Sequence, residues 1–445
     1  MTGSKLREGS PYKADRKRLD FIPGKVIVRF RTDAMESISL AALPSESVPI
    51  EMLDGVPDEI SQPMRALRAN AGLTQARSVM FAHDVQGSAG PAVWRHLGKS
   101  ANAARRTEDP ARRMSGITVL DVDSGQRQEA IRTLKKSSAV QSVELMPARW
   151  LLASSFAKLR PSLAAIDWHV AKMPSTPGRK IAVLDTGIDS THPSLADRIA
   201  AYETNGFSQK DLLGHGTHVA GIISGKYHPA SGFRGVGNAK LLVWKIFDDK
   251  PEPTTGEFYV DFEAYLSSLS QVLMSDARVV NLSIGGTQKS AQEAFVFNLL
   301  HERGIVVVAA MGNEYESGNP IEYPGAYPGV LAVGAVDGVG KRAKFSNTGR
   351  HIGLVAPGVC ILSTVPMKKS KYCEDVEFTS YDGTSMASPI VAAAANLLLA
   401  KNPKLTAAQA FKKLQSTAVK LPAQKGAGYS HAYGAGLLNL KRLLR

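Results

Sequence analysis

The chain has 445 residues, of which 44% are hydrophobic and 21% are charged. This composition is ordinary for globular proteins and excludes a wholly disordered chain. Lysine and arginine number 54 against 40 aspartates and glutamates, which gives a formal net charge of +14 at pH 7. Because the excess charge is divided between the parts of the chain before and after residue 152, it marks no single basic surface, and we expect no nucleic-acid partner.

Three features of the sequence bear on location. Residues 1–21 are charged and contain no apolar core of the kind that a signal peptide has. The longest stretch of small apolar residues, 387–400, is interrupted by Pro389 and is too short to cross a bilayer, so we expect a soluble protein without a membrane partner. Cys360 and Cys373 are expected to be free thiols, which agrees with a reducing compartment. These features predict a cytoplasmic location, with secretion as the alternative.

Residues 24–152 are predicted to form a small α+β domain after a flexible basic tail at 1–23. The order of the predicted strands and helices is β-α-β-β-α-β, which is the ferredoxin-like arrangement. In chain order they lie at 25–30, 57–70, 75–81, 116–123, 125–138 and 139–146. Residues 82–115 interrupt this order with glycine, alanine and a run of basic residues, and we expect an exposed insertion there.

Residues 153–445 are predicted to form a doubly wound α/β domain on a mainly parallel sheet, because short continuous apolar strands alternate with helices. The predicted strands lie at 180–187, 239–247, 277–286, 304–313 and 329–337, and the predicted helices at 216–225, 260–275, 289–302 and 386–400. Ligands of such domains bind beyond the carboxyl ends of the strands, so polar residues at those ends are the candidate functional residues.

Four polar residues stand at the ends of these predicted elements. Asp185 ends a strand, His215 begins a helix, Asn313 ends another strand, and Ser385 precedes the helix at 386–400. A serine hydroxyl is a weak nucleophile that needs a histidine to accept its proton, and an aspartate can fix the imidazole. The side-chain amide of Asn313 and the backbone N–H of Ser385 are suitable donors to an oxyanion. Together the four residues predict nucleophilic catalysis, whereas each alone would equally suit a helix cap or simple packing.

Seven short motifs give this prediction a family. VLDTGID, HGTHVAG, NLSIGG, AAMGN, FSNTG, VAPGV and GTSMASP follow one another in this order, and with them the chain resembles the subtilisin-like serine proteases from about residue 180 to residue 440. The resemblance implies that Asp185 orients the imidazole, His215 is the general base and acid, Ser385 is the nucleophile, and Asn313 is an oxyanion donor.

The resemblance also implies protein or peptide substrates. Ser283, Ile284 and Gly285 are similar to the family segment that pairs with the substrate backbone, and Gly256 is expected to begin the opposing edge. Adding an extended peptide between two such edges is a form of β-strand addition.

By the same resemblance, residues 24–152 are expected to be an inhibitory, chaperone-like prodomain, so that the chain is its own intramolecular inhibitor. Val143 and Glu144 are similar to a Val-Glu pair that lies shortly before the cleavage point in the family. Matching the family's distance between the cut and the catalytic aspartate places the cut within 149–155, close to the Leu152–Ala153 bond.

No cofactor and no metal are expected. Where many members of the family carry a calcium-binding loop after the HGTHVAG helix, residues 225–237 contain no carboxylate. A hard cation needs several oxygen ligands, so we expect no calcium ion in this loop.

Two other functions remain open at this point. A protease-like scaffold could bind protein or nucleic acid without turnover, and an esterase or transpeptidase could use the same acyl-enzyme. The side-chain preference before the cut is open as well. Small apolar residues near 283–286 and 309–314 favour an apolar side chain, whereas Glu314 and Glu316 could attract a basic one.

Overall fold

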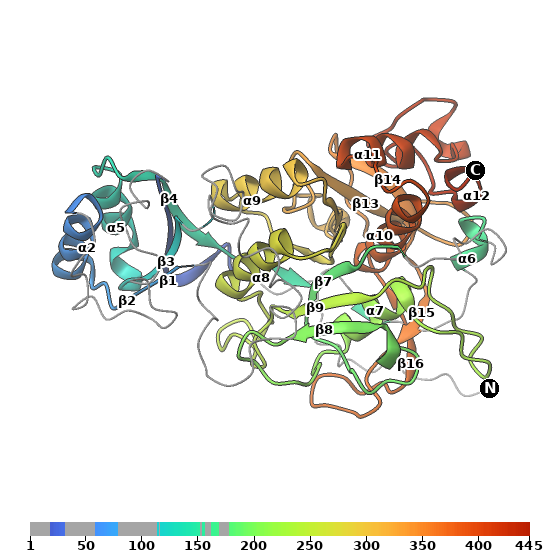
Figure 1. The fold of residues 1–445 in the computed structure, drawn as a ribbon, viewed down its shortest axis with the longest axis horizontal. Helices are drawn as coiled ribbons and strands as arrows, with labels where there is room; N and C mark the ends of the chain where they lie inside the picture. Colours follow the sequence, from blue (N-terminus) through green and yellow to red (C-terminus); the bar gives the residue numbers. More distant parts are fainter. Residues whose placement is uncertain are drawn as a thin grey trace.

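The computed structural model places most of the chain in two units (Figure 1). The described residues are 18–31, 58–78, 114, 116–151, 154–155, 162–168 and 178–445. Of the flexible tail expected at 1–23, residues 18–23 are described, and the last three of them already belong to a strand that begins at Phe21. Of the insertion expected at 82–115 only Met114 is described, and Leu152 and Ala153 lie outside the described residues.

The larger unit is built on a seven-stranded sheet whose neighbouring strands are all parallel. Across the sheet the strands are β14 (Ile352–Pro357), β13 (Val330–Val336), β12 (Val306–Ala310), β10 (Val279–Leu282), β7 (Ile181–Asp185), β9 (Leu241–Lys245) and β8 (Ile199–Glu203). The chain starts at β7, adds β8 and β9 on one side, and then adds β10, β12, β13 and β14 on the other. The sheet is therefore doubly wound, and its direction of growth switches between β7 and β10, where such folds bind ligands.

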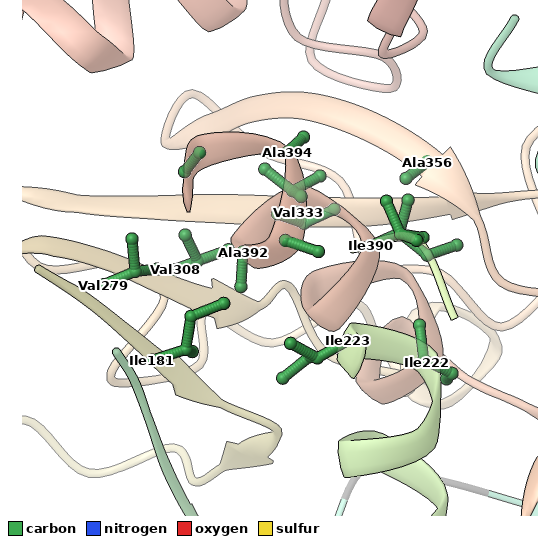
Figure 2. Close-up of a cluster of buried hydrophobic side chains, with 14 of the residues drawn as sticks. Ile181, Ile222, Ile223, Val279, Val308, Val333, Ala356, Ile390, Ala392 and Ala394 are labelled. Atoms are coloured by element: carbon green, nitrogen blue, oxygen red, sulfur yellow. The ribbon is translucent and has the colours of Figure 1, made fainter. Parts of the chain in front are cut away.

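Helices cover both faces of this sheet, and neighbouring residues of each strand point into different cores. The main helices are α7 (His215–Ser224), α8 (Phe262–Met274), α9 (Ala291–Glu302), α10 (Thr384–Lys401) and α11 (Ala407–Ser416). Ile181 and Val279 pack with α7 and α10 on one face, as Figure 2 shows. Ala182 and Val280 pack with α8 and α9 on the other. Strands covered on both faces explain the continuous apolar runs in the sequence.

Shorter elements surround the carboxyl edge of the sheet and the end of the chain. They are β5 (Trp150–Leu151), β6 (Ser154–Ser155), α6 (Ser162–Ala165), η5 (Ala196–Arg198), β11 (Ile284–Gly285), η6 (Tyr315–Ser317), β15 (Ile361–Thr364), β16 (Phe378–Asp382), η7 (Pro422–Gln424) and α12 (Leu440–Leu443). Two small sheets, β11-β5 and β15-β16-β6, join the segment around residue 150 to the larger unit.

The smaller unit is a four-stranded antiparallel sheet with two helices. Its elements are β1 (Phe21–Phe30), α2 (Asp58–Ala71), β2 (Gln75–Ser78), β3 (Ile117–Asp121), η3 (Ser124–Gln126), α5 (Arg127–Leu134) and β4 (Val140–Pro147). The strands lie in the order β2-β3-β1-β4. Val26 and Val28 face the helices and pack with Leu67 of α2 and Leu134 of α5.

The other face of this small sheet lies against the larger unit. Ile27, between the two valines, belongs with Met146 to the core that α8 and α9 form. The Arg29 guanidinium lies 3.9 Å from the ring centroid of Phe295 on α9. Figure 1 shows β4 leading from the smaller unit toward the larger one. One face of the small sheet is thus covered by its own helices and the other by a different unit.

Some predicted boundaries differ from the structure. The strand predicted at 304–313 ends at Ala310, because the backbone turns at Gly312, which has a φ of +113°. A Cβ atom at Gly312 would lie 2.5 Å from an oxygen of Glu322, so the position also has no room for a side chain. The turn places Asn313 beyond the sheet edge rather than within a strand.

Two further sequence predictions concern the pairing of the cysteines and the presence of a membrane-spanning helix. Cys360 and Cys373 are not joined by a disulfide. Among the residues that the structure describes, no helix combines the length and apolar character needed to cross a bilayer.

Candidate active site

Asp185 and His215 form a buried hydrogen-bonded pair at the carboxyl edge of the sheet. Asp185 is the last residue of β7 and His215 the first of α7, and 2.7 Å separates the imidazole Nδ1 from the Asp185 Oδ1. The carboxylate accepts, so Nδ1 carries the hydrogen and Nε2 is the acceptor of the ring. Within the described residues Nε2 is buried and has no hydrogen-bond partner. The pair is therefore arranged to take up a proton at Nε2.

A second buried carboxylate, that of Asp211, fixes the start of the helix that carries His215. Its Oδ1 accepts from the Thr186 hydroxyl at 2.8 Å and from the Gly214 N–H at 2.9 Å. Its Oδ2 accepts from the Thr217 N–H at 2.8 Å and from the Thr217 hydroxyl at 2.6 Å. A carboxylate at a helix N-terminus satisfies N–H groups that have no partner inside the helix. Asp211 was not predicted from the sequence, where its signal is its place shortly before a helix start.

Ser385 lies in the first turn of α10, next to the strand that neighbours Asp185. The Ser385 hydroxyl donates to the backbone carbonyl of Ser283 at 3.0 Å. Ser283 directly follows β10, and β10 pairs in register with β7, so Ser283 stands beside Asp185 at the sheet edge. The hydroxyl is turned to Ser283 and not to His215, and a rotation about the Cα–Cβ bond redirects it.

Asn313 is held beside Ser385 by the residue that precedes the serine. The Asn313 Oδ1 accepts from the Thr384 N–H at 3.0 Å and from the Thr384 hydroxyl at 2.8 Å. The oxygen end of the side-chain amide is thereby fixed, so the nitrogen is the end suited to donate to an oxyanion. The N–H groups of the first turn of α10 lie at the same place and belong to the positive end of a helix dipole.

An extended segment of the chain lies between two edges of the larger unit. Trp150 pairs antiparallel with Gly285 and Leu151 with Ile284, while Trp150 also bridges to Tyr259 on the opposite side. The Val260 N–H donates to the carbonyl of Arg149 at 2.8 Å. The segment is thus held as a middle strand.

Two sequence predictions about these edges, those for Ser283 and Gly256, stay predictions. The Ser283 hydroxyl donates to the Ser385 carbonyl at 2.9 Å, and the Ser283 carbonyl accepts from the Ser385 hydroxyl. In the register of Leu151 with Ile284, Ser283 would face Leu152, which lies outside the described residues, so its pairing with the segment stays a prediction. Gly256 closes a turn by donating its N–H to Glu252, and among the described residues the opposing edge contacts the segment at Tyr259 and Val260. The run of aromatic and β-branched residues Phe258, Tyr259 and Val260 is the signal that could have identified this edge.

The chain reaches a different edge a few residues later. Ser154 pairs with Asp382 and Ser155 with Tyr381, both in β16, which ends shortly before Ser385. The two residues between these paired segments, Leu152 and Ala153, lie outside the described residues.

A pair of carboxyl groups follows Asn313. Glu322 is buried and accepts from the Asn347 side-chain amide at 2.9 Å. Burial and the neighbouring charge of Glu314 raise the pKa of Glu322 well above its ordinary value. Burial works against ionisation of Glu314 too, but hydrogen bonding from Glu322 and the charge of Arg18, 2.7 Å away, lower the pKa of Glu314 below its ordinary value. Glu316, which the sequence offered beside Glu314, is exposed and belongs to η6.

Metal ligation has no candidate within the part of the chain that the structure describes, where no three His, Cys, Asp or Glu side chains gather to hold an ion. In the loop at 225–237, His228 and Phe233 form a β-bridge, and the His228 ring stacks on Phe378. The absence of calcium from this loop stays a prediction.

Known proteins resemble the chain in sequence. It is 39% identical over 269 residues to subtilisin amylosacchariticus from Bacillus subtilis subsp. amylosacchariticus, which is 59% of this chain and 64% of that protein. It is 38% identical over 269 residues to a subtilisin from Bacillus pumilus, covering 59% of this chain and 89% of the relative. The chain thus spans somewhat less than two thirds of the length of the first relative and most of the second.

These relatives correct the predicted location. The subtilisins that the chain matches are secreted enzymes, which contradicts the expectation of a cytoplasmic protein. That expectation rested on the composition of residues 1–21 and on two free thiols. Neither observation determines a compartment. Free thiols in particular are compatible with any compartment.

The fold and a family profile complete the comparison. Fervidolysin from Fervidobacterium pennivorans, described as a keratinolytic enzyme related to subtilisin, shares the fold with a TM-score of 0.68 and 24% identity, covering 99% of this chain and 62% of fervidolysin. The profile of the subtilase family matches residues 176–436, more than half of the chain. The larger unit is a subtilisin-like α/β domain, and the chain belongs to the subtilase family of serine proteases.

Proposed function

We propose that the chain is a serine endopeptidase made as a self-inhibited precursor, in which Asp185, His215 and Ser385 form the catalytic triad. One observation carries the proposal. The residues before 152 lie as an extended strand between two edges of the larger unit, and the chain resumes at 154 on a third edge, next to the nucleophile. This is the placement that a peptide about to be cut requires.

The geometry supports one sequence of steps. The Ser385 hydroxyl turns from the Ser283 carbonyl, gives its proton to Nε2 of His215, and attacks the carbonyl carbon of the scissile bond. The Asp185 carboxylate holds the Nδ1 hydrogen and stabilises the imidazolium. The oxyanion accepts from the Asn313 amide and from the Ser385 N–H. His215 then protonates the leaving amine, and the carbon–nitrogen bond breaks. In the second half of the reaction water takes the place of the amine, gives its proton to His215 and attacks the acyl-enzyme, and His215 returns a proton to Ser385 as the acid product leaves.

Contacts of the smaller unit support a role for residues 24–152 as the inhibitor. Glu144 on β4 caps the start of α9, accepting from the Ser290 hydroxyl and from the Ala291 N–H at 2.8 Å. Gln292 donates its side-chain amide to the Ser142 hydroxyl at 2.7 Å. These contacts hold the smaller unit against the start of α9, while Trp150 pairs with Gly285. A tethered strand meets the cleft at an effective concentration of about millimolar, so even modest affinity gives inhibition.

The test uses the full chain and Ser385→Ala. We expect the wild type to react with a fluorophosphonate at Ser385, to digest casein, and to be cut once within 149–155, with Leu152–Ala153 as the expected bond. The Ser385→Ala protein should stay uncut and unlabelled. Mass spectrometry of both proteins locates the cut. A wild type that takes no label and digests nothing would favour the non-catalytic scaffold. A wild type that takes the label and hydrolyses an ester substrate, but does not digest casein, would favour an esterase.

A further inference from the structure

A buried ion pair joins the segment in the cleft to the larger unit. The Arg149 Nη2 lies 2.5 Å from one oxygen of Glu293, and the Arg149 Nε lies 3.4 Å from the other. Both side chains are fully buried. Arg149 sits directly before Trp150 on the extended strand, and Glu293 belongs to the first turn of α9. A guanidinium thus fills a closed pocket of the larger unit while its backbone is paired as a substrate backbone would be.

The pocket is shaped for the guanidinium. The Tyr265 hydroxyl donates to the Glu293 Oε1 at 3.0 Å, and the Phe262 ring lies 5.7 Å from the guanidinium carbon. Gly286 forms part of the wall, where a Cβ atom would lie 2.9 Å from the Arg149 Nη1. A carboxylate already oriented by a tyrosine matches the planar fork of arginine better than the single ammonium of lysine.

Burial makes the pocket discriminating. Removing one partner of a buried ion pair leaves an uncompensated charge, which costs far more than the net worth of the pair. An apolar or acidic side chain in place of Arg149 would leave the Glu293 carboxylate buried without a cationic partner. The pocket therefore penalises wrong side chains more than it rewards the right one.

We propose that the pocket around Glu293 is a specificity pocket of the mature enzyme that selects arginine at the fourth residue before the bond to be cut, and that Arg149 fills it in the precursor. The fourth position follows from a cut after Leu152, so this inference rests on the proposed function. Once residues 24–152 leave, the pocket is open to an arginine of another protein. The substrate class is then an extended segment with arginine three residues before the residue that becomes acylated.

The first experiment compares peptides on one preparation of the mature wild-type enzyme. The peptides are internally quenched copies of residues 147–156, PARWLLASSF, with arginine, lysine, citrulline or leucine at the third place. Citrulline keeps the size of arginine but is neutral. We expect kcat/KM to fall on the order of 10²-fold from arginine to citrulline or leucine, with lysine between. Product masses report the bond that is cut. A leucine peptide cut within about threefold of the arginine peptide would overturn the inference.

The second experiment changes the pocket. Glu293→Leu should reverse the preference from arginine to leucine, while Glu302→Gln, at the exposed end of the same helix, should leave it unchanged. A ratio of two peptides on one preparation cancels losses in yield. If Glu293→Leu does not mature, the Arg149→Leu/Glu293→Leu precursor restores an apolar match. An unchanged preference in the mature variant contradicts the inference.

The two proposals fail differently. If the enzyme takes the fluorophosphonate label and digests casein but cuts all four peptides equally, the proposed function stands and the arginine pocket is contradicted. Enzyme that takes no label removes both.

Discussion

The two sheets of this molecule are covered in different ways. The seven-stranded sheet has its own helices on both faces, so its core is complete within the larger unit. The four-stranded sheet has its own helices on one face only, and its Ile27 face completes a core that belongs mostly to α8 and α9. A sheet whose second face is covered by another unit depends on that unit for its stability. The comparison suggests that the larger unit holds the chemistry, whereas the smaller unit contributes binding alone.

The largest effect should come from the proposed nucleophile in the larger unit. Ser385→Ala removes the group that forms the acyl-enzyme, and turnover should fall on the order of 10⁶-fold, because triad members act as one unit. Peptide hydrolysis by protein matured with a separate protease measures it. A loss below about tenfold would place the chemistry elsewhere and break the comparison.

The next largest effect should come from Asn313→Ala. This change removes one oxyanion donor and leaves the Asp185–His215 pair intact, so kcat should fall about 10²–10³-fold with little change in KM. The fixed oxygen end of the Asn313 amide makes Asn313→Asp a useful second variant, since it keeps the acceptor for Thr384 but loses the donor. Equal losses in both variants would support the donor role, and retained activity in Asn313→Asp would contradict it.

A change in the smaller unit should alter association without altering turnover. Glu144→Ala removes a carboxylate that caps α9, so inhibition by separately added residues 1–152 should weaken about 10- to 100-fold. The kcat of the mature enzyme is measured alongside and should not change. Glu129→Ala is the matched control, because among the described residues the partner of Glu129 is the largely exposed Arg132. Equal inhibition by the Glu144→Ala and wild-type fragments would show that this cap adds nothing.

The smallest effect concerns the pH dependence of stability in the larger unit. The folded state raises the pKa of Glu322, so its contribution to stability is complete below the ordinary glutamate value and is lost as pH rises through the folded value. Glu322→Gln should remove that loss, at most about 1.4 kcal/mol per pH unit. Denaturant unfolding from pH 4 to pH 8, in the uncut Ser385→Ala background, measures the difference. A difference in the free energy of unfolding between the two proteins that does not widen as pH rises would contradict the raised pKa of Glu322.

The sequence predicted what depends on neighbours along the chain. Asp185, His215 and Ser385 stand at strand or helix ends that local apolar patterns identify, and parallel strands carry such ends to one edge. The order of elements in the smaller unit was likewise readable from apolar periodicity, whereas in the larger unit the edge strands β8 and β14 and the helix α11 were not predicted.

Features that depend on contacts between distant segments were not predictable in this way. Arg149 meets Glu293 across 144 positions of sequence, and Glu144 meets the start of α9 across a similar distance. Only Glu293 left a local signal, since it stands at helical spacing from the buried Val296, Phe297 and Leu300 on a face that should be apolar. A charged residue on such a face needs a partner, but the spacing does not say which.

The strand at Trp150 is paired on both sides, and that arrangement has a consequence for the folded proteins an enzyme of this kind would meet. A segment can offer hydrogen-bonding groups on both sides only if no helix or sheet of its own already uses them. A native protein must therefore open locally before it can enter the cleft. Its rate of digestion should follow the free energy of that local opening rather than the number of suitable sequences on its surface.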